Sequence, residues 1–218
     1  PTNIKKYKII ENKKLVFVSS YEIRYPEISE KIWNEIKIKC SDNFNFFDEK
    51  NFWNDQEKRN LDDNVKFLVY RDLKNFQRKQ IIRELFKTYP NEFELFGTNW
   101  DTIVKTEIKQ IGHEKAKKLY SGNVCLDLGS KCGSLTLYPR SIDIIESGGL
   151  LLQLKQSDSH IIFGDNEKLF TFISFDDLYL KLKKILNDSN YYNELINKQF
   201  QIFKNSYKKI EKQLDEIF

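Results

Sequence analysis

Arg140, Ser141 and Asp143 stand close together at the start of a short predicted helix. The first turn of a helix presents unpaired N–H groups and the positive end of the helix dipole, and Arg140 adds a guanidinium group in the same turn. Such a helix start is a binding place for phosphate. A carboxylate one turn further along, Asp143 or Glu146, can accept hydrogen bonds from the hydroxyls of a sugar. This chemistry is that of holding a nucleotide, with Arg140 and Ser141 on its diphosphate.

Each of these side chains also has a plainer interpretation. Arg140 can form a surface salt bridge with Asp143 or Glu146, which contributes only about 0–1 kcal/mol. The two acids can equally face solvent on a short helix. The chain uses arginine sparingly beside abundant lysine, and arginine binds planar or bidentate partners better than lysine does. Arg140 is therefore our first candidate for a diphosphate ligand.

The helix that carries these residues is bounded by a proline and a double glycine. Pro139 suits the first helical turn, where a missing N–H costs nothing, and Gly148-Gly149 supplies the left-handed residue that ends a helix. Ile142, Ile144 and Ile145 between them point toward a core. The leucine run that follows at 150–154 predicts a buried strand.

The rest of the chain alternates predicted strands with predicted helices. Strands are predicted at 15–18, 65–70, 93–96, 124–128, 150–154 and 169–173, with a further strand or edge at 104–111. Helices are predicted at 28–38, 73–89 and 113–120, then from 175 onward and through the tail at 191–218. This rhythm indicates an α/β fold, a Rossmann-like parallel doubly wound sheet with a helical C-terminal extension. We divide the chain into a strand-helix segment with its connection at 1–64, which can be part of an incomplete N-terminal half, and a domain at 65–218.

Two serines follow the first predicted strand. In an open α/β sheet the loop after a strand is where ligands bind, so Ser19 and Ser20 are candidates for a phosphate loop. They can also simply cap the next element. The capping interpretation is favoured, because the glycines that let a backbone approach a phosphate closely are missing.

Composition limits the classes of function. The 218 residues carry a net charge of +4, with 36 basic and 32 acidic residues mixed along the whole length. A nucleic-acid-binding protein would concentrate its basic residues, so no nucleic-acid partner is predicted. No run long and apolar enough for a membrane span is present. Cysteines at 40, 125 and 132 show no metal-binding spacing and only two histidines, His113 and His160, are available, so we expect no metal site and a reduced, cytoplasmic protein.

The run Arg140-x-Ile142-Asp143-x4-Gly148-x-Leu-Leu-Leu resembles the Arg-x-Phe-Glu-x4-Gly-x-Leu-Leu pattern of the C-terminal, donor-binding domain of GT-B glycosyltransferases. The likeness is closest to the CgeB-like (spore-maturation-protein-like) branch, within the glycosyltransferase family 1-like group. It continues upstream through 93–100 and 118–120 and downstream through 170–178. It therefore covers about residues 92 to 205, with order and spacing kept.

The resemblance implies a donor substrate and places further residues near it. It implies a UDP-sugar or GDP-sugar as donor and no tightly bound cofactor. Asp143 matches the glutamate that binds the ribose, and Lys131 and Ser134 lie in the loop that approaches the diphosphate. The first glutamate of the family's Glu-x7-Glu motif is absent, since Leu135 stands there. His113 lies near the place of the base; as a lone histidine at a helix start it is a weak catalytic candidate.

The sequence leaves three hypotheses for function. The first is a glycosyltransferase, or its donor-binding domain, that transfers a hexose to an unknown glycan, protein or small-molecule acceptor. A second domain or chain would then complete the cleft. The second is a non-catalytic nucleotide-binding or scaffold domain that keeps the fold. The third, a nucleotide- or flavin-binding module, is weaker because no Gly-x-Gly-x-x-Gly is present.

Overall fold

A single parallel sheet organises the described part of the chain. The computed structural model describes residues 13–20, 34, 62–104, 108–129 and 138–215. The strands are β1 (Leu15–Val18), β2 (Phe93–Phe96), β3 (Val124–Asp127), β4 (Leu150–Leu154) and β5 (Thr171–Phe172). All pairings are parallel and the order is β2-β1-β3-β4-β5. The predicted α/β class with a parallel sheet is confirmed.

The strand order creates a switch point between β1 and β3. From β1 the chain moves outward to β2, then crosses back to β3 and continues to β4 and β5 in the opposite direction. Lys109 adds one parallel bridge to Phe96 on the outer side of β2. That bridge occupies the place of the third strand in the Rossmann order 3-2-1-4-5-6, and it is what the stretch predicted at 104–111 contributes. β1, which comes from the 1–64 segment, lies inside this sheet, next to β2 and β3.

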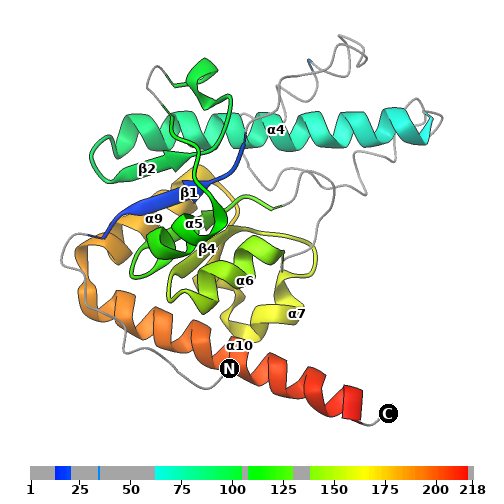
Figure 1. Ribbon diagram of the computed structural model, residues 1–218, viewed down its shortest axis with the longest axis vertical. Helices are drawn as coiled ribbons and strands as arrows, with labels where there is room; N and C mark the ends of the chain where they lie inside the picture. The colour runs from blue at the N-terminus through cyan, green and yellow to red at the C-terminus, as the bar shows by residue number, and fades with distance from the viewer. Residues whose placement is uncertain (1–12, 21–33, 35–61, 105–107, 130–137, 216–218) are drawn as a thin grey trace.

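Helices cover both faces of the sheet. They are α4 (Asp63–Thr88), α5 (His113–Tyr120), α6 (Pro139–Glu146), α7 (Ser159–Phe163), α8 (Glu167–Phe170), α9 (Phe175–Asn187) and α10 (Ser189–Asp215), with short 3₁₀ turns at Trp100–Thr102 and Gly164–Asn166. Figure 1 shows α5 and α6 in front of the sheet and α9 behind it. The rings of Tyr89, at the end of α4, and Tyr179, on α9, lie 6.2 Å apart, which places the end of α4 beside α9. The sheet is therefore doubly wound, and α10 packs against α9, β4 and α7 as the predicted helical extension.

The strand predicted at 65–70 is wrong, because these residues form the first turns of α4. The helix is 26 residues long and begins after Asp62, whose side chain accepts a hydrogen bond from the N–H of Asn64 at 2.8 Å. This N-cap satisfies one of the unpaired donors of the first turn. No glycine or proline interrupts the sequence from there to the end of the helix. The helix predicted at 28–38 lies outside the described residues, apart from residue 34.

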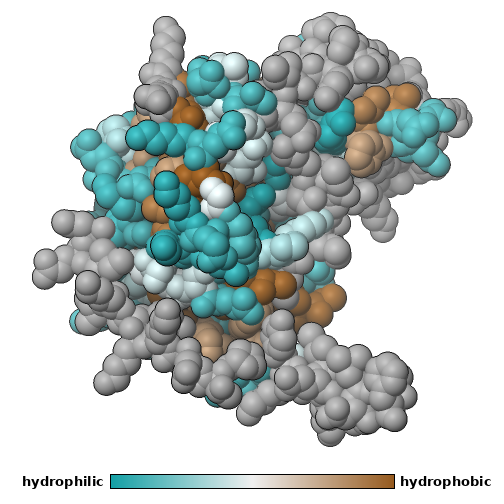
Figure 2. Space-filling model, viewed as in Figure 1, coloured by the Kyte–Doolittle hydropathy of each residue, from teal (hydrophilic) through white to brown (hydrophobic). Residues whose placement is uncertain are grey.

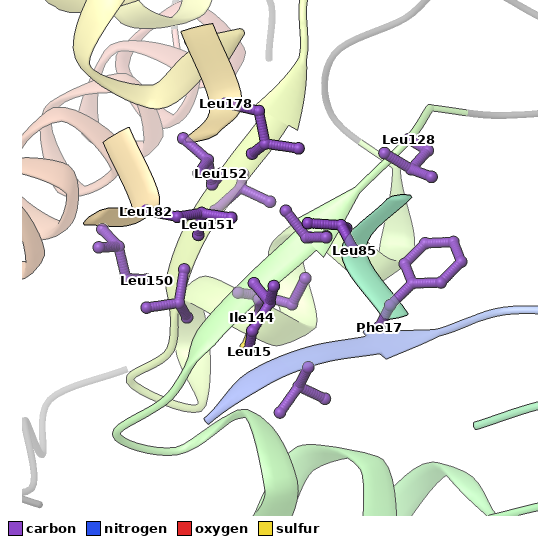
Figure 3. Close-up of a cluster of buried hydrophobic side chains, with 14 of the residues drawn as sticks. Leu15, Phe17, Leu85, Leu128, Ile144, Leu150, Leu151, Leu152, Leu178 and Leu182 are labelled. Atoms are coloured by element: carbon purple, nitrogen blue, oxygen red, sulfur yellow. The ribbon is translucent and has the colours of Figure 1, made fainter. Parts of the chain in front are cut away.

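The core lies on both faces of the sheet. Leu150, Leu151 and Leu152 of β4 are at most 1% exposed. Figure 3 shows them between Ile144 of α6 and Leu182 of α9. A parallel strand covered on both faces is apolar on both, which is why the leucine run predicted a buried strand. Among the described residues, no helix combines the length and the hydropathy that spanning a bilayer requires.

Candidate functional site

The carboxyl ends of β1 and β3 meet at the switch point, where doubly wound sheets bind their ligands. The backbone of Ser19, directly after β1, is held on two sides. Its N–H donates to the carbonyl of Phe96 at 3.0 Å, and its carbonyl accepts from the indole Nε1 of Trp100 at 2.6 Å. A Cβ atom at Gly97 would stand only 1.8 Å from that carbonyl, so the two chain segments touch. Both backbone polar groups of Ser19 are thus used in hydrogen bonds within the chain. Ser20, which is half-buried, is the last described residue of this loop.

A buried carboxylate ends β3. The carboxylate of Asp127 is 1% exposed and accepts hydrogen bonds from the N–H of Gly129 at 2.9 Å and from Nε2 of Gln153 at 3.2 Å. It also accepts from the hydroxyl of Ser141, and Nη1 of Arg140 lies 3.5 Å away. Gln153 is its direct neighbour across the β3–β4 pairing. We call Asp127, Arg140, Ser141 and Gln153 the Asp127 cluster.

The Asp127 cluster gives two predicted ligand residues a partner within the chain. Ser141 is fully buried, and its hydroxyl donates a hydrogen bond to Asp127. The side chain of Arg140 keeps 29% of its surface exposed, and only Nη1 points to Asp127. A guanidinium group has five N–H donors. Arg140 can therefore hold Asp127 and still donate to an anion at the surface.

Asp143, the predicted ribose ligand, joins α6 to α5. Its carboxylate lies 3.3 Å from Nζ of Lys117 and 3.4 Å from Nδ1 of His113. The carboxylate of Asp143 is 18% exposed and the His113 side chain 61% exposed, so the group lies at the surface, which Figure 2 shows as hydrophilic over α5. Glu146, at the end of α6, is exposed. The structure thus brings Asp143 and His113 together, although sequence analysis treated them separately.

Two buried groups beside this pair stay neutral. Burial raises the pKa of Tyr120 above its usual range, and nearby Arg140 acts in the opposite direction. Burial likewise raises the pKa of the Cys125 thiol. Both side chains lie below the surface, between α5, α6 and the sheet. Neither is poised to act as a base at neutral pH.

Both backbone polar groups of Gly129 form hydrogen bonds with side chains. Its N–H donates to Asp127, and its carbonyl accepts from Nη2 of Arg78, a residue of α4 that is 1% exposed. Its φ is +73°, and a Cβ atom would stand 2.8 Å from Nε2 of Gln156, which follows β4. Only glycine fits this point without strain. The loop after β3 is therefore fixed at its second residue by contacts from α4, from β3 and from the residue that follows Lys155 after β4.

Sequence analysis missed the α4 side of the site. Figure 1 shows the first half of α4 extending beyond the carboxyl end of β1. The middle of α4 carries Asn75 and Arg78, which are 4% and 1% exposed. The signal that could have found them is the presence of several polar residues in positions where an amphipathic helix would be apolar. Lys131 and Ser134 lie outside the described residues, and the described residues hold no group of three metal-binding side chains.

Comparisons of the chain with models of protein families, with curated proteins and with solved structures gave no match. The case for a function therefore rests on the switch point, on the charged groups around it and on the sequence resemblance.

Proposed function

We propose that the chain binds the nucleoside diphosphate of a sugar nucleotide at the carboxyl ends of β1 and β3. In this proposal it is a glycosyltransferase, or the donor-binding domain of one, that transfers a hexose from a UDP-sugar or GDP-sugar. One observation carries the binding part. Two arginines, Arg78 from α4 and Arg140 from α6, reach the end of β3 from opposite faces of the sheet. The sugar-nucleotide part is supported by the resemblance over residues 92 to 205.

The chemistry asks the site to stabilise a leaving group. When the hexose moves to an acceptor hydroxyl, the bond between its anomeric carbon and the diphosphate oxygen breaks, and negative charge grows on that oxygen. Preorganised N–H donors stabilise such charge electrostatically. The exposed donors of Arg140 and the first turn of α6 would do this. The acceptor and a base for its proton would come from a second domain or chain.

The ribose is assigned to Asp143 or Glu146 on the same helix. Asp143 has to exchange its contacts with Lys117 and His113 for bonds to the ribose hydroxyls. Both contacts are long for charge-assisted hydrogen bonds and lie at the surface, so the exchange costs little. Glu146, which is exposed, offers a second carboxylate three residues further along.

The alternative is a non-catalytic scaffold domain. It is favoured by the fact that Ser141, Arg140 and Asp143 all have partners within the chain. A fold that keeps these residues for internal contacts alone would show the same geometry. Binding and turnover therefore have to be measured separately.

The test is a thermal-shift and calorimetric titration with UDP, GDP, their common sugar conjugates and NAD. A ligand that binds only the folded state adds about 2.7 kcal/mol at one hundred times its Kd. We expect one nucleoside diphosphate to stabilise the wild type and to lose this effect in Arg140→Ala. Arg83→Ala, an exposed arginine on α4, is the matched control and should respond like the wild type. Binding without donor hydrolysis would support the scaffold, and no response to any nucleotide would overturn the proposal.

A further inference from the structure

Asn75 is a buried side-chain amide with both of its polar atoms open. The residue is 4% exposed. Within the described part of the chain, neither its Nδ2 nor its Oδ1 has a hydrogen-bond partner. Buried polar groups in folded proteins are nearly always paired, because a group that gives up water without a replacement destabilises the fold. An amide with two open atoms needs a reason beyond packing.

The position of Asn75 on α4 shows which way it faces. Asn75, Arg78 and Ile82 fall on one side of the helix, since they are spaced by three and four residues. Ile82 is fully buried, and Arg78 reaches the carbonyl of Gly129 at the end of β3. Asn75 lies one helical turn before Arg78 in the chain, at the middle of α4. Its amide therefore lies on the side of α4 from which Arg78 reaches the end of β3.

We propose that the amide of Asn75 binds the base of the nucleotide, reading an edge that carries a hydrogen-bond donor beside an acceptor. This inference rests on the function proposed above. A side-chain amide holds an N–H donor and a carbonyl acceptor in one plane. Its complement is a planar group with the same pair reversed, such as N3–H beside O4 of uracil or N1–H beside O6 of guanine. A phosphate, which only accepts, would leave Oδ1 of Asn75 open.

This assignment divides the ligand between the two sides of the site. Arg140 and the start of α6 would take the diphosphate, and Asn75 on α4 would take the base. Arg78, between them, would hold the loop after β3 in place through Gly129. The base edge would then pair Nδ2 and Oδ1 of Asn75, which have no hydrogen-bond partner among the described residues.

The experiment compares ligands that differ at the proposed edge alone. The affinities of UDP and N3-methyl-UDP, and of GDP and N1-methyl-GDP, are measured by calorimetry on the full chain. The methyl group removes the N–H donor and leaves the phosphates intact. We expect a loss of about ten-fold or more in the wild type for the nucleotide that binds, which is the scale of a bidentate amide–base contact. Asn75→Leu should bind the methylated and unmethylated forms equally, and inorganic pyrophosphate should bind both proteins alike.

The control is Asn64→Leu, the same exchange at an exposed position of α4, which should keep the wild-type ratio. A wild type that binds the methylated base as well as the natural one overturns the inference and leaves the proposed function standing. A ratio that persists in Asn75→Leu does the same. If that variant does not fold, Asn75→Ser takes its place under the same criterion. A wild type that binds no nucleotide overturns both the inference and the function on which it rests.

Discussion

The two helices that reach the end of β3 from opposite faces of the sheet, α4 and α6, use their polar groups differently. On the α6 side, the carboxylate of Asp127 receives bonds from a backbone N–H, a hydroxyl and a side-chain amide, with Arg140 nearby. On the α4 side, Asn75 is also buried, and its side-chain amide has no hydrogen-bond partner among the described residues. A buried carboxylate with several donors fixes a structure, because each donor would be costly to leave alone. A buried amide without such partners is better explained by something that binds there.

The largest expected effect comes from removing Asp127, the acceptor at the centre of the α6 side. Asp127→Ala would leave Ser141, Gln153 and the N–H of Gly129 without their acceptor, and Arg140 without its buried partner. We expect the free energy of unfolding to fall by about 3–5 kcal/mol, as measured by urea denaturation. Asp143→Ala is the control, because its ion pairs lie at the surface and contribute about 0–1 kcal/mol. Equal losses in the two variants would mean that the Asp127 cluster is no more structural than the surface pairs.

A smaller effect of opposite sign is expected on the open side. Asn75→Leu removes a buried amide that has no partner in the described part of the chain, and it should raise the free energy of unfolding of the unliganded protein by about 1 kcal/mol. Leucine is also the better helix former, by roughly 0.5 kcal/mol or less. Asn64→Leu measures that second contribution by itself at an exposed site. A loss of stability in Asn75→Leu would show that the amide is bonded after all, and would end the contrast between the two sides.

The smallest effect concerns the other end of α4. The hydroxyl of Tyr89, the residue that ends this helix, is also buried without a partner among the described residues. Burial, with Tyr179 and Glu92 adding to it, raises the pKa of Tyr89 to about 12, against 10.0 for the free side chain. The unfolded chain therefore releases this proton first, and the stability that the neutral hydroxyl provides is lost as pH rises from about 10 to about 12.

The variant Tyr89→Phe distinguishes the effect of the Tyr89 proton on stability from the effect of the lysines, which titrate in the same pH range. Its free energy of unfolding should fall less steeply than that of the wild type above pH 10, in a denaturant series at fixed ionic strength. Parallel curves for the two proteins would show that Tyr89 keeps its ordinary pKa.

Sequence reasoning found the sheet more easily than the site. Apolar runs predicted the strands at 15–18, 93–96 and 150–154, because buried parallel strands are apolar on both faces. The run at 65–70 looks the same in composition and is a helix. Two features outside the run make it helical. Before the run, Asp62 caps the helix, and after it no glycine or proline interrupts the sequence up to the end of α4. Short apolar runs are ambiguous for this reason.

The sequence indicated candidate site residues only where one helix carries them. Arg140, Ser141 and Asp143 could be predicted as ligands because they share the first turns of α6, and that prediction is not yet tested. Asp127 was visible as the single charge in an apolar strand, but its bond to Ser141 depends on how β3 and α6 pack. Asn75 and Arg78 were missed because a polar residue on a helix is ordinarily exposed, and the signal they left was only the presence of polar residues where an amphipathic helix would be apolar. Their burial results from the position of α4 over the end of the sheet.

The place of β1 has a consequence for the order in which the molecule can fold. Leu15 pairs with Phe93 on one side and with Val124 on the other, so a strand made early in synthesis waits for two partners that emerge much later. Closing such distant pairs slows folding, because the chain loses entropy before the contacts form. β4 and β5, by contrast, lie near each other in sequence and can pair soon after synthesis. We expect refolding to begin in the C-terminal half and to finish when β1 enters the sheet, which is the step that joins its two sides.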